Sequence, residues 1–143
     1  DEKLARAREL GAAAGVNYRT DDVPQAVLDH TGGRGADVSI NSVGAAAWVL
    51  DAKALRRGGR AVLCGVTTGA EAPTNLQAVY WNQLSLLGST MGSLQDFRLM
   101  LETMRTTGLR PVIDSTWSLD QARDAMGRME RGEQFGKILL FPQ

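Results

Sequence analysis

The sequence has few of the residues that metal and disulfide sites need. It contains one cysteine, Cys64, and one histidine, His30, among 143 residues. A single cysteine excludes an internal disulfide and is typical of a reducing compartment, so we expect a cytoplasmic protein. A zinc site with three or four nitrogen and sulfur ligands cannot be built from these two side chains. The sequence therefore predicts no metal bound by this chain.

The sequence also has no excess of charge and no long apolar segment. Lysine plus arginine number 16, and aspartate plus glutamate number 16, so the formal charge is zero at pH 7. Without a basic excess there is no electrostatic reason to expect a nucleic acid or an anionic membrane as partner. The longest apolar runs, AVLCGV at 61–66 and ILLF at 138–141, are too short to span a bilayer. No secretory signal pattern follows Asp1, so we expect no membrane partner.

No catalytic group with a recognisable partner is present in the sequence. His30 falls near the expected end of a helix, where a solvated or capping histidine is the ordinary interpretation. Cys64 lies inside an apolar segment, and we expect it to be a buried, unreactive core residue. The serines have no base at a spacing that would activate them. We therefore predict no catalytic residue in this chain.

Helical and extended patterns alternate along the chain. Apolar segments typical of buried parallel strands lie at 36–43, 60–66 and 84–90, and further extended segments lie at 16–18, 111–117 and 137–141. Helical patterns lie at 1–10, between Asp22 and Gly32, and at 45–57, 94–106 and 118–131. This alternation predicts an α/β fold with a doubly wound parallel sheet. Because the chain opens on a helix before a weak strand, we expect the sheet to be incomplete at its N-terminal side.

Side chains that can cap helices precede three of these helical patterns. Asp21 or Asp22 can cap the second helix. Ser93 with Asp96, and Ser118 with Gln121, have the spacing of a capping box. We expect a helix to begin at each of these places.

Three of the expected strands end in segments that contain glycine. These segments are NSVG ending at Gly44, CGVTTG with Gly65 and Gly69, and GSTMG with Gly88 and Gly92. Ligands of open α/β sheets bind beyond the carboxyl ends of the strands. A single glycine there either serves a tight turn or lets a flat ligand approach the backbone. Glycines at three successive strand ends favour a ligand crevice.

The sequence contains no recognisable phosphate-binding motif beside this crevice. There is no GxGxxG, and GGRGAD at 32–37 precedes a strand instead of following one. LLGSTMGS at 86–93 has the layout of a phosphate loop before a helix, but no lysine follows its second glycine. We therefore expect the segment 86–93 to contact something other than a phosphate.

Four segments in this order resemble the zinc-type medium-chain dehydrogenase/reductase superfamily, in particular its zinc-binding alcohol dehydrogenase and quinone oxidoreductase group. The segments are GADVSINSVG, GGRAVLCGVTTG, YWNQLSLLGSTMGS and FGKILLFP. The resemblance covers essentially the whole chain. It implies the C-terminal part of a Rossmann-like nucleotide-binding domain over residues 1–110, and a terminal strand-helix-strand segment over 111–143 that returns toward the catalytic domain. The family's first strand, glycine-rich loop, second strand and catalytic domain have no counterpart in this sequence.

The resemblance also implies which residues contact the cofactor. Matching positions lie near the adenosine (Ser42, Val43 and Gly44), against the nicotinamide ribose (Gly65, Val66 and Thr67) and at the carboxamide, which the backbone binds (Ser89 and Met91). Lys3 and Tyr18 match positions beside the adenosine 2′-phosphate in quinone oxidoreductase-like members. A lysine and a phenol suit a phosphate dianion, which favours NADP while leaving NAD possible. The alternative is that Lys3 is simply a solvated helix residue.

The function that the resemblance implies is the cofactor-binding part of an NAD(P)-dependent oxidoreductase. The parent enzyme would transfer a hydride between nicotinamide and a small alcohol, aldehyde, or quinone or enone substrate. We expect the isolated chain to be inactive and to bind no zinc, even if the parent enzyme does.

The alternative is a non-catalytic, Rossmann-like dimerisation module. In the family, LSLLGS is an edge strand that pairs with its copy, and here it contains no proline or lysine that would discourage pairing. We expect a homodimer through residues 84–92. A methyltransferase-like fold would need a glycine-rich loop after its first strand, which this sequence does not have.

Overall fold

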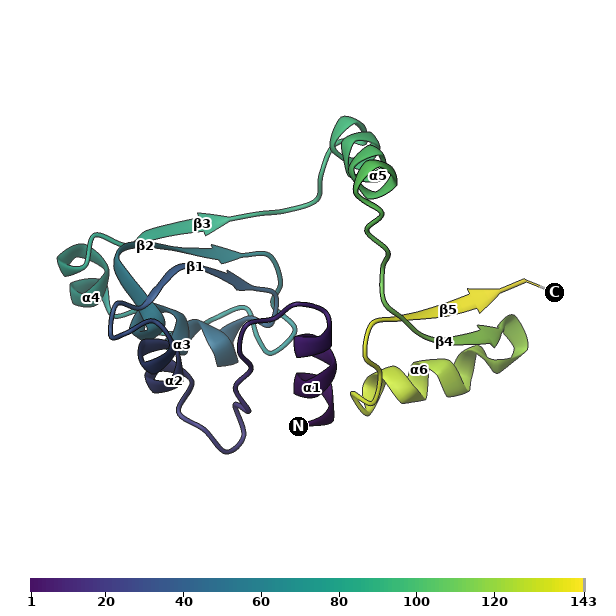
Figure 1. Ribbon diagram of the computed structural model, residues 1–143, viewed down its shortest axis with the longest axis horizontal. Helices are drawn as coiled ribbons and strands as arrows, with labels where there is room; N and C mark the ends of the chain where they lie inside the picture. The colour runs from purple at the N-terminus through teal and green to yellow at the C-terminus, as the bar shows by residue number, and fades with distance from the viewer. Residues whose placement is uncertain (143) are drawn as a thin grey trace. The chain divides into compact units, whose positions relative to one another are not determined.

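A parallel three-stranded sheet organises the first of two compact units, Asp1–Met91 and Gly92–Gln143, in the computed structural model, which describes residues 1–142 (Figure 1). Its strands are β1 (Ala36–Asn41), β2 (Leu55–Leu63) and β3 (Ser85–Gly88), adjacent in that order. The last residues of the strands are in register, since Asn41 lies opposite Leu63 and Leu63 opposite Gly88. The three carboxyl ends therefore meet at one edge of the sheet, and an α/β fold with parallel strands is confirmed.

Four helices accompany this sheet. They are α1 (Glu2–Glu9), α2 (Val23–His30), α3 (Ala45–Ala54) and α4 (Leu76–Trp81). Helix α3 links β1 to β2 and α4 links β2 to β3, both on the same side of the sheet, and α2 packs against α3 (Figure 1). The Asp22 carboxylate accepts a hydrogen bond from the Gln25 backbone N–H at 3.0 Å, so the predicted cap of α2 is confirmed. Helix α4, which the sequence did not predict, begins at an equivalent cap made by Asn75.

The two faces of the three-stranded sheet differ sharply in burial. Paired residues of neighbouring parallel strands point to the same face. Ala61 points toward the helices and is 1% exposed, and it packs with Leu55 and Leu84 in a small core. On the opposite face, Ile40 is 75% and Leu87 47% exposed. Within the first unit, the apolar side chains of this second face are thus left accessible.

Three predicted elements of the first unit differ from the structure, among them the strand expected at 60–66, which is β2 over Leu55–Leu63. Residues 16–18 form no strand, because Asn17 closes a turn in which its side-chain oxygen accepts the Arg19 backbone N–H at 3.1 Å. The predicted helix over 45–57 ends at Ala54, since the chain enters β2 at Leu55 and bulges before Arg60. Gly58 makes this bulge possible with a φ of 72°.

The second unit contains a long helix and a pair of parallel strands. Its elements are α5 (Leu94–Thr107), β4 (Ile113–Ser118), the single turn η1 (Leu119–Gln121), α6 (Ala122–Glu130) and β5 (Lys137–Phe141). Both predicted capping boxes are present, at Ser93 with Asp96 and at Ser118 with Gln121. Between β4 and β5 the chain crosses over through α6, which buries Ala125 at 2% exposure.

An ion pair joins β4 to α6 in this unit. The Asp114 side chain, only 3% exposed, accepts hydrogen bonds from Arg128 Nε at 2.8 Å and from the Phe135 backbone N–H at 2.9 Å. The Arg128 guanidinium and the Phe135 N–H together hold the pKa of the Asp114 carboxyl well below its usual range.

The described residues include no helix that is long and apolar enough to cross a bilayer. The division between a nucleotide-binding domain over 1–110 and a returning segment over 111–143 concerns the domains of a larger enzyme, and it stays a prediction.

Candidate functional site

Three loops meet at the carboxyl edge of the first sheet, as the glycine-marked strand ends predict. They comprise Ser42–Gly44 after β1, Cys64–Gly69 after β2 and Ser89–Met91 after β3 (Figure 1). The Ser89 backbone N–H donates to the Leu63 carbonyl at 2.9 Å and so extends the pairing of β3 with β2. Six of the predicted cofactor contacts in these loops are exposed and accessible to a ligand: Ser42, Val43, Val66, Thr67, Ser89 and Met91.

The loops after β1 and β2 are bound directly to each other. The Thr68 backbone N–H donates to the Val43 carbonyl at 2.8 Å, and the Thr68 hydroxyl donates to the same carbonyl at 2.9 Å. On the other side, the Ala45 backbone N–H donates to the Gly69 carbonyl at 3.1 Å. The two loops therefore form one bonded surface. Sequence reasoning placed Gly69 at this strand end but gave Thr68 no role.

Gly44 and Gly65 are required by this contact between loops. Gly44 has a φ of 100°, and a Cβ there would lie 2.7 Å from the Cα of Val66. A Cβ on Gly65 would collide with the Ser42 carbonyl oxygen. Both glycines thus allow close packing of one loop's backbone against the other, so their lack of a Cβ is explained by the protein itself and not by a ligand. Gly88 differs, because a Cβ there would have no atom within 4 Å.

Asn41, the last residue of β1, holds the loop that follows it. Its side chain is buried at 3% exposure, and its Oδ1 accepts the backbone N–H groups of Val43 at 2.9 Å and Gly44 at 2.8 Å. Its Nδ2 donates to the Gly44 carbonyl at 3.2 Å and to Asp51 Oδ2 at 2.8 Å. Sequence reasoning missed this residue, although an asparagine directly before a glycine-containing turn is a recognisable signal.

The N-termini of the helices that follow two of these loops are already occupied by protein groups. The Ala46 backbone N–H at the start of α3 donates to the Thr68 hydroxyl at 3.1 Å. At the start of α5, Asp96 Oδ2 accepts hydrogen bonds from the Ser93 hydroxyl and from the Ser93 backbone N–H, each at 2.7 Å, and these two bonds lower the pKa of the Asp96 carboxyl. A carboxylate at this position repels a phosphate. The geometry thus supports the expectation that LLGSTMGS is not a phosphate loop.

Lys3 and Tyr18 lie outside the three loops. Lys3 is exposed in the first turn of α1, and Tyr18 is 74% exposed in the segment between α1 and α2. Tyr18 lines a shallow hollow that it shares with Asp21, Asp22 and Lys53. Two carboxylates beside the phenol oppose a phosphate dianion, and Lys53 is the cation that lines the same hollow.

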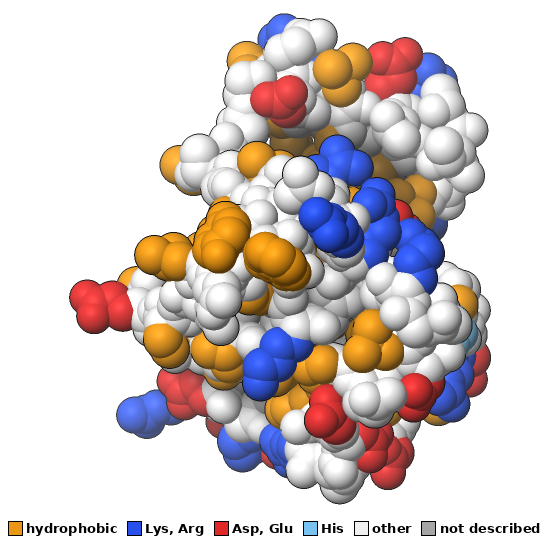
Figure 2. All heavy atoms as spheres, turned by 90° about the vertical axis from the view of Figure 1, so that its left-hand side faces the viewer, with side chains coloured by type: hydrophobic (Ala, Val, Ile, Leu, Met, Phe, Trp, Pro, Cys, Tyr) orange, Lys and Arg blue, Asp and Glu red, His pale blue; other side chains and the backbone are white. Residues whose placement is uncertain are grey.

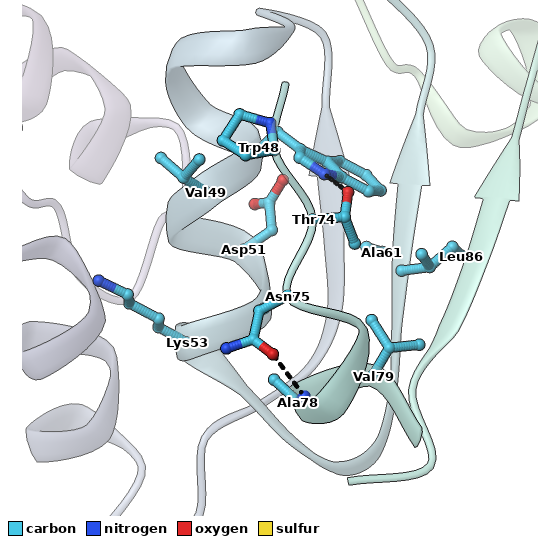
Figure 3. A pocket seen from close by; sticks show the side chains of 12 residues that line it. Trp48, Val49, Asp51, Lys53, Ala61, Thr74, Asn75, Ala78, Val79 and Leu86 are labelled. Atoms are coloured by element: carbon cyan, nitrogen blue, oxygen red, sulfur yellow. Dashed lines mark hydrogen bonds between the residues drawn. The ribbon is translucent and has the colours of Figure 1, made fainter. Parts of the chain in front are cut away.

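A separate apolar hollow of about 270 Å³ lies between α3, α4 and the sheet. Figure 3 shows Trp48 among the side chains that line this hollow, and its indole Nε1–H donates to the Thr74 hydroxyl at 2.9 Å. Trp48 and Thr74 also line a second hollow of about 210 Å³ that includes Gly44, Val66 and Gly69. Trp48 is therefore partly buried and packs against the small core, and its hydrogen bond to Thr74 links α3 to the segment that precedes α4.

The remaining candidate side chains fit no catalytic arrangement. His30 is exposed at the last position of α2. Cys64 is also exposed, which contradicts the predicted burial, because β2 ends one residue before it. Within residues 1–142, no group of three or more histidine, cysteine, aspartate or glutamate side chains could hold a metal ion.

Comparison with known proteins identifies the family. The sequence profile described as zinc-binding dehydrogenase matches residues 1–106. This chain belongs to the zinc-binding dehydrogenase family. The predicted resemblance to zinc-type dehydrogenases is thereby confirmed.

Individual members of the family match almost the whole chain. A zinc-type alcohol dehydrogenase-like protein, YogA, from Leptosphaeria maculans is 34% identical over 98% of this chain and 41% of its own length. Quinone oxidoreductase-like protein 2 from Rattus norvegicus is 30% identical over 98% of this chain and 43% of its own. The crystal structure of an NAD-dependent alcohol dehydrogenase superposes with a TM-score of 0.88 at 36% identity, covering 97% of this chain and 40% of that one.

This zinc-binding dehydrogenase chain thus spans about two fifths of the length of the curated relatives that it matches. The Rossmann-like expectation for its fold is confirmed by the structural match. Individual cofactor contacts, from Lys3 to Met91, stay predictions.

Proposed function

We propose that this chain is part of the dinucleotide-binding domain of an NAD(P)-dependent oxidoreductase. The parent enzyme transfers a hydride between nicotinamide and a small alcohol, aldehyde, or quinone or enone substrate. The observation that carries the proposal is the register of the three strand ends, which gathers the loops after β1, β2 and β3 at one edge. In open α/β sheets this edge is where the ligand binds.

Each of the three loops contacts a different part of the cofactor. Ser42, Val43 and Gly44 lie toward the adenosine, and Gly65, Val66 and Thr67 toward the nicotinamide ribose. The backbone of Ser89 and Met91 holds the carboxamide, where open space around Gly88 leaves the backbone accessible. A bound nicotinamide supplies the hydride chemistry. This chain holds the cofactor in position and helps to exclude competing reactions.

The three loops can contact a dinucleotide, but they provide no binding site for its pyrophosphate. The N-termini of α3 and α5 are occupied by Thr68 and Asp96, so the pyrophosphate must be held elsewhere in the enzyme. We therefore propose that the isolated chain has no turnover and binds NADPH weakly.

Titration with NADPH, followed by nicotinamide fluorescence, tests this proposal. The intact dehydrogenase should bind with the micromolar affinity typical of such enzymes, and the 143-residue chain should not. Micromolar binding by the isolated chain would overturn the claim that the pyrophosphate is held by residues outside this chain. No dinucleotide binding by the intact protein would overturn the proposed function itself.

For the cofactor we propose NADP, with Lys3 as the cation at the 2′-phosphate and Tyr18 as a hydroxyl partner. The charge of Lys3 must then outweigh the carboxylates of Asp21 and Asp22, which lie in the Tyr18 hollow. Zinc, if the parent enzyme uses it, is held by residues outside this chain.

A second candidate function is dimerisation through β3. In the described part of the chain, β3 pairs with β2 alone, and its residues Leu86 and Leu87 are 40% and 47% exposed. Figure 2 shows exposed apolar side chains gathered on the side that carries α4, where Leu76, Tyr80 and Trp81 are each more than half exposed. An exposed, apolar edge strand is a template for pairing with a second copy.

Sedimentation of the 143-residue chain tests the dimer. We expect a dimer at micromolar concentration and a monomer after Leu86→Lys, because a charged lysine on an edge strand disfavours pairing with a second copy. His30→Lys, on the exposed end of α2, is the control and should leave the dimer intact. A wild-type chain that is monomeric at high concentration would contradict this second function.

A further inference from the structure

A chain of three polar side chains runs from the sheet into α3 beneath the adenosine-side loop. Ser39 Oγ donates to Asp51 Oδ1 at 2.5 Å, and Asn41 Nδ2 donates to Asp51 Oδ2 at 2.8 Å. Ser39 and Asn41 alternate along β1 and therefore point to the same face, toward the helix that carries Asp51. The Asp51 carboxylate thus receives one hydrogen bond on each oxygen.

This arrangement fixes the orientation of the Asn41 amide. A carboxylate accepts hydrogen bonds and donates none, so Asp51 binds the NH₂ side of the amide and turns the oxygen toward the loop. That oxygen then accepts the N–H groups of both Val43 and Gly44. With all of its polar atoms paired and its side chain 3% exposed, Asn41 has one favourable orientation.

We propose that Asn41 is a positioning residue for the dinucleotide and that Asp51 sets its orientation. Asn41 holds the backbone of Ser42–Gly44 in the form that meets the adenosine side of the cofactor, and the cofactor itself does not touch Asn41. The inference rests on the proposed function, since it assigns a role at the same site.

Substitutions that change one partner at a time separate this role from general stability. Asn41→Ala removes both the acceptor and the donor. Asn41→Asp keeps an acceptor for the loop but places a second carboxylate against Asp51, and these like charges repel. The double variant Asn41→Asp with Asp51→Asn restores a hydrogen bond between the two side chains with its donor reversed.

Asn75→Ala is the matched control. Asn75 also uses its side-chain oxygen to accept a backbone N–H, that of Ala78 at 3.0 Å, but it caps α4 away from the strand ends (Figure 3). Asn75→Ala should lower the free energy of unfolding by an amount typical of a lost helix cap. It should leave the Kd for NADPH unchanged.

Two measurements are made on each variant: the Kd for NADPH in the intact dehydrogenase, and amide exchange at Val43 and Gly44 in the 143-residue chain. Asn41→Ala and Asn41→Asp should raise the Kd about tenfold to a hundredfold, the effect of disrupting a buried hydrogen-bonded group, while kcat at saturating cofactor changes little. Asn41→Ala should also speed exchange at Val43 and Gly44 without affecting Ala61 in the core. The double variant should recover at least half of the lost binding free energy.

Each result decides between the claims. If the wild-type enzyme binds NADPH and Asn41→Ala binds it equally well, the inference is wrong while the proposed function stands. If the wild-type enzyme binds no dinucleotide, the proposed function fails, and amide exchange still shows whether Asn41 orders the loop. Should Asn41→Ala fail to fold, the comparison of Asn41→Asp with the double variant decides, and an absence of rescue there would overturn the role of Asp51.

Discussion

Gly44 and Val66 approach so closely that only a hydrogen fits between their backbones: a Cβ on Gly44 would lie 2.7 Å from the Val66 Cα. Gly44→Ala should therefore destabilise the protein in two ways, through the φ of 100° and through the collision. Gly33→Ala is the control for the first effect, because Gly33 has a φ of 82° and a Cβ there would have no atom within 4 Å. We expect a loss of about 1–3 kcal/mol for Gly33→Ala and a larger loss for Gly44→Ala, measured by urea unfolding. Equal losses would show that the two loops do not meet as described.

The Ser89 side chain is expected to be dispensable for catalysis. Ser89 is exposed, and its role in the proposed site belongs to its backbone carbonyl, because its backbone N–H already donates to the Leu63 carbonyl. Ser89→Ala in the intact enzyme should leave kcat and KM for the cofactor nearly unchanged. A fall in kcat beyond about a hundredfold, the scale at which a proton-transfer group matters, would instead make the hydroxyl catalytic.

Lys3 should control the preference between NADPH and NADH. Lys3→Ala should weaken binding of NADPH about fivefold or more and leave NADH unchanged, because only NADPH carries the 2′-phosphate that a charge-assisted contact would recognise. Lys53→Ala is the matched comparison, since Lys53 lines the Tyr18 hollow from α3. If Lys53→Ala alone reduces the NADPH preference, Tyr18 works with Lys53 and the role given to Lys3 is wrong. If the wild-type enzyme prefers NADH, the NADP proposal falls.

The buried carboxylate of Asp114 should make the second unit sensitive to acid. Its pKa is lower in the folded state than in the unfolded chain, so its ion pair with Arg128 stabilises the fold above about pH 4 and is lost as the pH falls further. Asp114→Asn should lower the free energy of unfolding at pH 7 and flatten its dependence on pH between about 5 and 2. Urea unfolding at several pH values, followed by the amide signals of β4 and β5, measures both effects. Asp120→Asn, an exposed position in η1, should retain the wild-type slope, and a wild-type slope for Asp114→Asn would contradict the assignment.

Much of the fold could be predicted from local patterns. The strands predicted at 36–43 and 137–141 follow from apolar runs, and the structure has them at 36–41 and 137–141. The caps at Asp22 and Ser93 follow from side chains that satisfy free backbone N–H groups. The strand predicted at 16–18 was wrong because a strand needs a neighbouring strand to pair with, and the same residues form the Asn17 turn instead. The predicted burial of Cys64 was wrong because the apolar run continues one residue past the end of β2.

The candidate site was predictable at its strand ends but not in its internal support. Glycine spacing identified Gly44 and Gly65, but only the structure shows that each makes room for the neighbouring loop. Asn41 and Asp51 are ten positions apart on different elements, and nothing in the sequence pairs them. Such contacts depend on tertiary packing, which a single sequence does not display.

The most direct test is to observe the backbone amides of the intact dehydrogenase by NMR as NADPH is added. The largest shifts within this chain should fall in the three strand-end loops, at Ser42–Gly44, Gly65–Thr67 and Ser89–Met91. Amides at the Trp48 hollow between α3 and α4 should shift little. Large shifts at that hollow, with the strand-end loops unchanged, would contradict the account.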